Sequence, residues 1–167
     1  MCIRDSIDTA MWLFDETPEV VYAKSGQINH EHEDFATIML GFKNNKTATI
    51  SSNWITPTRV RNFNAVCTDA RIFSDFITQE IRIETDSGSE NPKSEKIEPL
   101  SLEIKNFLEM IEGKNDLIVK PEQAVNVTKI AEAALLSSKK GTPIYLDIRW
   151  IGICWICLYV LSINIFH

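Results

Sequence analysis

The residues best suited to chemistry cluster in one stretch of the chain, from Glu33 to Arg61. A tryptophan offers an apolar face to a sugar ring or a base, amides and hydroxyls supply hydrogen bonds, and guanidinium groups match phosphate or carboxylate oxygens. Neighbouring residues combine these groups and predict a site for a polar, anionic small molecule. The alternative is a tryptophan packed at a sheet edge beside two solvated arginines. The candidate binding residues are Asn53, Trp54, Thr56, Arg59 and Arg61.

A second polar cluster precedes them, with two imidazoles and three carboxylates within residues 29–34. His30 and His32 are two residues apart, so in a strand they would point to one side, where they could share a metal. The alternatives are a solvated strand edge and a hydrogen bond to substrate. We assign His32 to substrate binding and assign no metal ligand.

The sequence lacks the turns that other enzyme classes use to bind phosphate or to expose a nucleophile. Its six glycines never lie close together, so no glycine-rich turn can bring backbone amides onto a pyrophosphate. Serine, histidine and aspartate occur without a nucleophile elbow, so nothing points to hydrolysis. By itself, the chain is not expected to hold a dinucleotide or a nucleoside triphosphate.

Composition bounds the class of protein. A hydrophobic content of 44% across 167 residues suits a folded core. The net charge of −6, from 17 basic and 23 acidic residues, creates no field that would attract nucleic acid. Four cysteines are too few for a disulfide scaffold, and the opening residues do not have the pattern of a secretion signal. We therefore expect a cytoplasmic protein.

Helical and strand periodicities define the elements that position these residues. Apolar residues at positions 7, 10, 11 and 14 have helical spacing and predict the end of a helix. Strand-like runs follow, joined by connections too short for parallel crossovers. The sequence therefore predicts an open sheet of about five or six mostly antiparallel strands. The runs are residues 20–24, 35–42, 47–54, 61–66, 70–76 and 80–84.

Parity sets the register of the hairpin formed by residues 35–42 and 47–54. Even-numbered positions are largely apolar on both strands. A three-residue loop pairs residues whose numbers sum to an even value, which keeps the apolar faces together. We predict this loop, with Asn45 in the left-handed conformation that asparagine tolerates.

Two helices are predicted after the strands. The first has an apolar stripe and ends at Gly113, while the second starts at Pro121, has a face of small residues and ends before Gly141. Strands followed by helices predict an α+β fold with the helices packed on one face of the sheet. The other face is left for a ligand or a partner subunit.

Both ends of the chain differ from the middle. We expect residues 1–6 to be an artefactual leader, residues 7–149 to form the domain and residues 150–167 to be an apolar tail. The tail contains no Asp, Glu, Lys or Arg, and its 18 residues are at the lower limit for crossing a bilayer. It is either appended sequence or a membrane anchor, and a membrane is not our expected partner.

Six blocks occur in a recognisable order: Ile7-Asp8-x-x-x-Trp12-Leu13, Glu33-Asp34-x-Ala36, Asn53-Trp54-x-Thr56-Pro57-x-x-x-Arg61, Asp75-Phe76-Ile77-x-Gln79, Glu98-Pro99-Leu100-x-Leu102-Glu103 and Gly141-x-Pro143. In this order they resemble the C-terminal domain of the glucose-fructose oxidoreductase / inositol dehydrogenase / rhizopine catabolism (Gfo/Idh/MocA) family. The resemblance spans about residues 7–146. Its Asn-Trp-x-Thr-Pro segment looks most like members that oxidise the 3-hydroxyl of UDP-N-acetylglucosamine.

The resemblance implies a longer parent protein, in which an N-terminal Rossmann domain binds NAD or NADP and a sugar hydroxyl is oxidised. The family's acid-base residues are a lysine of a Glu-Lys-Pro motif and an Asp-x-x-x-His pair. This chain has no Glu-Lys-Pro, and the pair falls at Met1 and Asp5. We therefore expect a fragment that binds no cofactor and is inert by itself, and we assign no catalytic residue.

The alternatives to a piece of an enzyme are binding modules. The family commonly builds a dimer through the exposed sheet face, so the fragment could self-associate and bind no sugar. A membrane-anchored sugar-binding domain is the other alternative. The expected partners are a sugar or nucleotide sugar, the missing Rossmann domain and a second copy of the chain.

Overall fold

The computed structural model describes residues 3–93, 95–116, 119–147 and 158–166. Within them, nine strands form one sheet in the order β7-β6-β5-β4-β9-β3-β2-β1-β8. Adjacent strands run antiparallel except β3 and β9, which are parallel. The predicted α+β class with a mostly antiparallel open sheet is confirmed. The elements are α1 (Ile3–Phe14), β1 (Val20–Gly26), β2 (Phe35–Gly41), the 3-10 turn η1 (Lys43–Asn45), β3 (Thr47–Asn53), β4 (Val60–Cys67), β5 (Arg71–Asp75), β6 (Glu80–Thr85), β7 (Gly88–Glu90), α2 (Pro99–Ile111), α3 (Pro121–Lys140), β8 (Ile144–Tyr145) and β9 (Leu158–Phe166).

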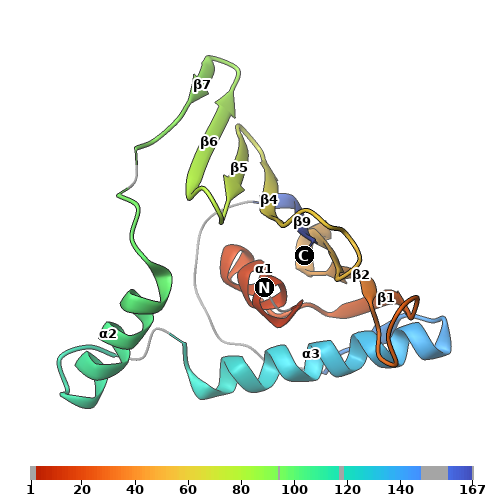
Figure 1. Cartoon of the computed structure of the whole chain (residues 1–167). Helices are drawn as coiled ribbons and strands as arrows, with labels where there is room; N and C mark the ends of the chain where they lie inside the picture. Colours follow the sequence, from red (N-terminus) through yellow and green to blue (C-terminus); the bar gives the residue numbers. More distant parts are fainter. Residues whose placement is uncertain (1–2, 94, 117–118, 148–157, 167) are drawn as a thin grey trace.

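The core lies between the sheet and two helices. Helices α1 and α3 lie on the same side of the sheet, where α3 packs on β1 and α1 contacts α3 and β3 (Figure 1). Alternate residues of the strands and one stripe of each helix are buried there, as the two periodicities require. The core residues are Ile7, Ala10, Met11, Phe14, Val21, Ala23, Ile38, Leu40, Phe42, Ala48, Ile50, Ala65, Val127, Ile130, Ala133 and Ala134.

The β2–β3 hairpin has the register expected from parity. Ile38 pairs with Ile50 and Leu40 with Ala48, so both apolar rows face the core. The N–H of Phe42 donates to the carbonyl of Lys46 at 2.9 Å, which leaves a three-residue loop. Asn45 has φ 61, in the left-handed region, and its neighbour Asn44 has φ 55. The predicted loop and its left-handed asparagine are confirmed.

A buried hydroxyl joins α3 to the sheet. Ser137 is fully buried, and its Oγ accepts a hydrogen bond from the N–H of Ala23 at 3.0 Å. The same hydroxyl donates to the carbonyl of Thr142 at 2.8 Å, just past the helix. Gly141 ends α3 with φ 69, a left-handed cap that glycine adopts without steric cost. The serine thus fixes the docking of α3 along β1.

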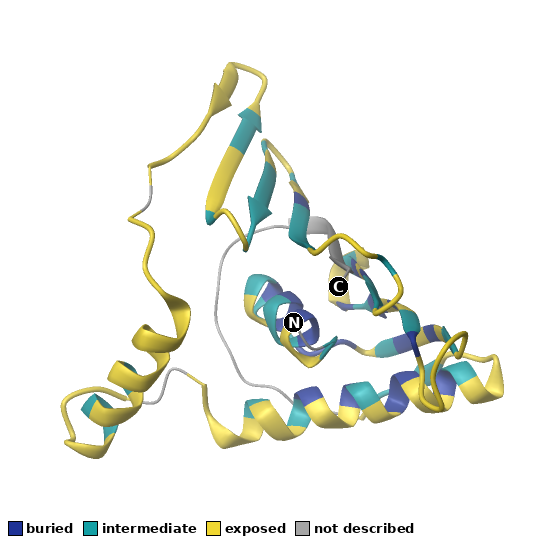
Figure 2. Cartoon of the chain, in the orientation of Figure 1, coloured by how far each residue is buried: buried dark blue, intermediate teal, exposed yellow. Residues whose placement is uncertain are grey.

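Helix α2 differs from the expectation that both late helices pack on the sheet. It begins at Pro99, its helical stripe is the one predicted, and none of its residues is buried. Figure 2 shows it mostly exposed and apart from the α1 and α3 layer. Periodicity predicted its amphipathic character, but the surface that would cover the stripe depends on the rest of the molecule. The exposed stripe is Leu100, Ile104, Phe107, Leu108 and Ile111.

Part of the apolar tail is a strand. Leu158–Phe166 forms β9, whose backbone pairs with β3 on one side and with β4 on the other. We expected neither this strand nor β7, so the sheet has more strands than the five or six predicted from the sequence. Within the part of the chain that the structure describes, no helix has the length and apolar character to cross a bilayer.

Candidate functional site

A cavity of about 340 Å³ opens where β2 begins and β3 ends, beside the two packed helices. Antiparallel pairing brings these strand ends together, because Phe35 is opposite Asn53. Helices α1 and α3 each contribute one apolar wall residue, Ile3 and Leu135. The remaining lining combines hydroxyls, carboxylates and aromatic rings: Ser25, Glu33, Asp34, Phe35, Ala36, Ser52 and Trp54.

Asp34 organises the loop that borders this cavity. Its side chain is 2% exposed, and its Oδ2 accepts hydrogen bonds from the backbone N–H groups of Ile28 at 2.7 Å, Asn29 at 2.5 Å and His30 at 3.2 Å. Its Oδ1 contacts Nδ1 of His30. The N–H of Asn29 above all, with those of Ile28 and His30 and the imidazole contact, holds the pKa of the Asp34 carboxyl well below its usual range.

The backbone of Asp34 ties the same loop to two strand ends. Its N–H donates to the carbonyl of Gly26 at 2.9 Å, at the end of β1. Its carbonyl accepts the N–H of Trp54 at 2.9 Å, just after β3. One buried residue therefore positions both the loop 27–33 and the tryptophan at the cavity. The sequence motif Glu33-Asp34 was visible, but this role was not.

Asn53, Trp54 and Thr56 lie at the end of β3, and an Asx turn follows the strand. The Oδ1 of Asn53 accepts the N–H of Ile55 at 3.1 Å, the N–H of Thr56 at 2.9 Å and the hydroxyl of Thr56 at 2.8 Å. This is an Asx turn, in which the side chain stabilises the bend after the strand. The Asn53 and Thr56 groups that we assigned to substrate therefore bond to each other here. Trp54 lines the cavity and is 61% exposed.

The other three predicted residues lie elsewhere. Arg59 is exposed in the loop before β4, Arg61 is half-buried in β4, and His32 is exposed in the loop 27–33. None of the three is among the described residues that line the cavity at Trp54. Their contact with a ligand stays a prediction.

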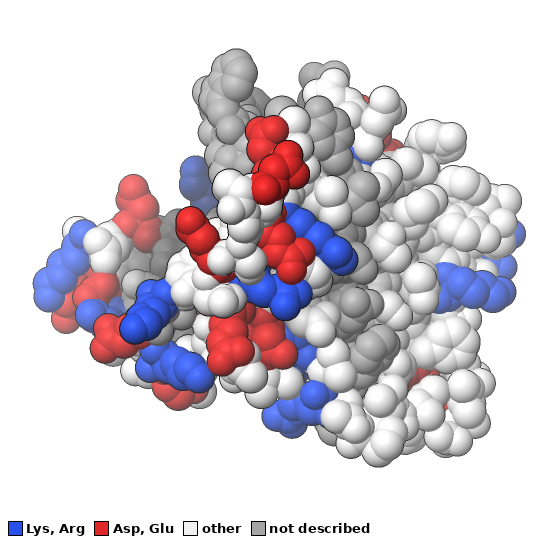
Figure 3. Space-filling model, turned by 90° about the horizontal axis from the view of Figure 1, so that it is seen from above, with Lys and Arg blue, Asp and Glu red and all other residues white. Residues whose placement is uncertain are grey.

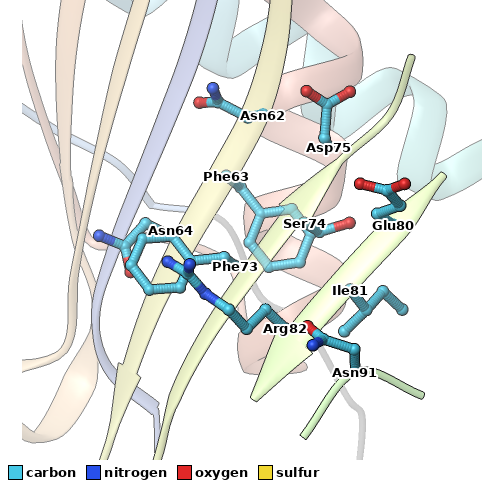
Figure 4. Close-up of a pocket in the computed structure, with 10 residues that line it drawn as sticks. All are labelled: Asn62, Phe63, Asn64, Phe73, Ser74, Asp75, Glu80, Ile81, Arg82 and Asn91. Carbon is cyan, nitrogen blue, oxygen red and sulfur yellow. The ribbon is translucent and has the colours of Figure 1, made fainter. Parts of the chain in front are cut away.

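The opposite face of the sheet carries a second cavity, of about 500 Å³, over β4, β5 and β6 (Figure 4). The guanidinium groups of Arg71 and Arg82 each lie 4.4 Å from the centre of the Phe73 ring, a cation–π arrangement. Nε of Arg71 donates to Asn64 at 3.1 Å, and Nε of Arg82 lies 3.2 Å from Glu84. We missed this cluster, although pairing across the β5–β6 hairpin predicts the Phe73 and Arg82 contact.

Charges are mixed over the surface. In Figure 3, acidic and basic side chains are interspersed over one part of the visible face, and the rest of that face is largely uncharged. Within the part of the chain that the structure describes, no three His, Cys, Asp or Glu side chains are grouped so that they could hold a metal ion. Burial raises the pKa of the Cys67 thiol, which keeps it protonated at neutral pH.

Three solved structures share this fold. UDP-N-acetylglucosamine 3-dehydrogenase GnnA from Acidithiobacillus ferrooxidans is 18% identical, with a TM-score of 0.78 over 83% of this chain and 46% of its own. An aldose-aldose oxidoreductase from Caulobacter crescentus, complexed with glycerol, is 18% identical, with a TM-score of 0.76 over 86% and 45%. An NAD-binding protein from Listeria innocua is 17% identical, with a TM-score of 0.68 over 85% and 45%.

The chain thus spans less than half the length of these proteins. No curated protein matches the sequence. The family model of the GFO/IDH/MocA C-terminal domain matches residues 6–73. This segment runs from α1 into β5 and includes the Asp34 loop and Trp54. Residues 6–73 are thus similar to the GFO/IDH/MocA C-terminal domain, and the fold of the chain is similar to that of the solved oxidoreductases.

Proposed function

We propose that this chain is the substrate-binding domain of an NAD(P)-dependent oxidoreductase that acts on a sugar or a nucleotide sugar. The observation that carries the proposal is the cavity at Trp54, which is formed by strand ends, the Asp34 loop, Leu135 of α3 and Ile3 at the start of α1. Its volume of about 340 Å³ is within the range of small-molecule sites.

The lining of this cavity suits a sugar. An exposed indole can cover the apolar C–H face of a pyranose, while the hydroxyls of Ser25 and Ser52 and the carboxylate of Glu33 can bond its hydroxyl groups. The nucleotide part would extend toward the arginines after β3, where guanidinium groups match phosphate oxygens. A UDP-sugar dehydrogenase and an aldose oxidoreductase among the proteins of the same fold support this substrate class.

The residues of this chain do not fit the coenzyme. No glycine-rich strand-turn-helix occurs in the sequence, and Met1 and Asp5 stand where the family has its Asp and His. We therefore propose that the coenzyme and the proton-transferring lysine belong to another part of a longer cytoplasmic protein. The NAD-binding protein from Listeria is covered by this chain over only 45% of its length. This supports the proposal that the coenzyme is bound by another part of a longer protein.

A tryptophan comparison tests the proposal. UDP-N-acetylglucosamine is titrated into the full chain in the millimolar range, with binding followed by NMR shifts of residues at the cavity. We expect Trp54→Ala to weaken binding about fivefold or more, since an aromatic ring contact contributes about 0.5–1.5 kcal/mol beyond area burial. Trp12→Ala is the matched control, because this 75% exposed indole lies on α1 and does not line the cavity. Equal affinity of all three proteins would contradict the site.

The second candidate function is self-association through the open sheet face. The Arg71, Phe73 and Arg82 cluster favours it, because arginine and aromatic side chains are enriched in interfaces. Sedimentation of the wild type and of Phe73→Ser would test it. A wild-type monomer at high protein concentration would contradict this second function and leave the first unaffected.

A further inference from the structure

The contact between His30 and Asp34 is a buried carboxylate holding an exposed imidazole. Asp34 is 2% exposed and His30 is 65% exposed. The carboxylate is fixed by three backbone N–H groups of the loop that contains the histidine. The imidazole is therefore attached through Nδ1 to a rigid acceptor, while most of its ring faces solvent.

This arrangement determines which ring nitrogen carries the proton. An ionised carboxylate is only an acceptor, so Nδ1 of His30 must be the donor in their contact. In the neutral imidazole, Nε2 then has a free lone pair and accepts hydrogen bonds. A histidine without such a partner would exchange between the two tautomers. Asp34 thus makes one nitrogen of His30 a fixed acceptor.

The partner of His30 belongs to the cavity that contains Trp54. Asp34 itself lines that cavity, and its carbonyl accepts the N–H of Trp54. The imidazole therefore contacts a residue that lines the cavity, although His30 is not itself one of the described lining residues. Within the same loop, Nε2 of Gln27 donates to the carbonyl of Glu31 at 2.7 Å, which further restrains the path of the chain.

We propose that His30, oriented by Asp34, accepts a hydrogen bond at Nε2 from a hydroxyl group of a sugar bound in the Trp54 cavity. Asp34 is the positioning residue of this pair. The proposal rests on the proposed function for its ligand. It differs from the sequence-based assignment of His32, because the described structure links His30 and not His32 to the wall of the cavity. If His30 had only a structural role, it would complete the bonding of Asp34 and would not respond to a ligand.

The first measurement is the tautomer of His30 in the 15N-labelled full chain, read from long-range proton–nitrogen spectra at neutral pH. We expect the proton on Nδ1. Addition of UDP-N-acetylglucosamine should shift the Nε2 resonance and leave Nδ1 nearly unchanged, because only Nε2 meets the ligand. A proton on Nε2 in the wild type would overturn the proposal.

Asp34→Asn tests whether the position of the ring proton matters for sugar binding. The three loop N–H groups need an acceptor, so the amide oxygen should take the place of Oδ2, and its NH2 should then face Nδ1 of His30. That contact forces the proton to Nε2, which becomes a donor. We expect the reversed tautomer together with about fivefold weaker sugar binding, the effect of one neutral hydrogen bond.

His30→Ala should weaken binding by the same factor, and Glu31→Ala, in the same loop, is the matched control. If Asp34→Asn disrupts the loop, His30→Ala still decides the question, since it leaves the Asp34 contacts to the backbone in place. If the wild type binds the sugar and His30→Ala binds it equally well, the role proposed for His30 and Asp34 is wrong, but the proposed function is not affected. If the wild type does not bind the sugar, the proposed function is wrong, and the proposed hydrogen bond from the sugar to His30 is wrong with it.

Discussion

The two ends of the sheet differ in what covers them. At the end formed by β1, β2 and β3, helices α1 and α3 bury alternate strand residues, and three backbone N–H groups of the loop 27–33 donate to Asp34. At the end formed by β5, β6 and β7, no described helix packs on the strands. Helix α2 lies apart from these strands and carries an exposed apolar stripe (Figure 1). Both ends have strong local patterns. The difference shows that the periodicity of the sequence is enough to form a helix or a strand, whereas most of its stability comes from packing against another surface.

The largest expected effect is a loss in the free energy of unfolding when a buried isoleucine of β3 is truncated, compared with an exposed isoleucine of α2. Ile50 is 0% exposed, so Ile50→Ala should lower the free energy of unfolding by about 2–5 kcal/mol, because it removes packed atoms and leaves a cavity. Ile104 is 52% exposed, and Ile104→Ala should change it by less than about 0.5 kcal/mol. Urea unfolding of both variants measures this. Similar losses would mean that α2 is packed in solution.

A smaller effect is expected where α3 meets β1. Ser137→Ala should cost about 1–3 kcal/mol, because the buried N–H of Ala23 loses its acceptor. Thr128→Ala is the control on the same helix, since its hydroxyl donates at 3.0 Å to the carbonyl of Ala124 and is exposed. Thermal unfolding of both variants is the measurement. Equal changes in the unfolding temperature would show that the hydroxyl of Ser137 does not stabilise the packing of α3 on β1.

A third effect is a dependence of the free energy of unfolding on acid pH. Because the pKa of Asp34 is lowered in the folded chain, its ionised form stabilises the fold fully above the ordinary pKa of about 3.9, and this stability is lost as pH falls toward the lower folded value. Asp34→Asn should therefore flatten the loss of stability in urea below about pH 4. An unchanged acid slope would contradict the role given to Asp34.

Asp8 is the opposite case in the same covered end. Burial, and secondarily the charge of Asp5, raise the pKa of the Asp8 carboxyl. Its ionisation therefore opposes folding as pH rises above the ordinary value. In the wild type, Asp8 should lower the free energy of unfolding as pH rises above the ordinary pKa, and Asp8→Asn should remove this decrease. The two variants therefore distinguish a carboxylate that stabilises the fold from one that destabilises it.

Much of the fold could be predicted from the order of residues. The alternation in residues 35–42 and 47–54 predicted both strands, their register and the left-handed Asn45, because side-chain parity and loop geometry are local. The grouping of Asn53, Trp54 and Thr56 at the end of β3 was also predictable, because they are neighbours in sequence. The contact of Asp34 with His30 was not, since a row of polar residues is equally typical of a solvated edge.

The sequence by itself thus determined most of the helices and strands, though not β7 or β9, and which of their faces are apolar, because backbone propensity and periodicity act over a few residues. Only the tertiary structure decided that α1 and α3 cover one end of the sheet while α2 stays exposed, that β9 lies between β3 and β4, and that a buried aspartate joins a loop to Trp54. These outcomes depend on contacts between residues far apart in the chain. Whether such contacts form is decided by the shape and burial of both surfaces together, which no local pattern encodes.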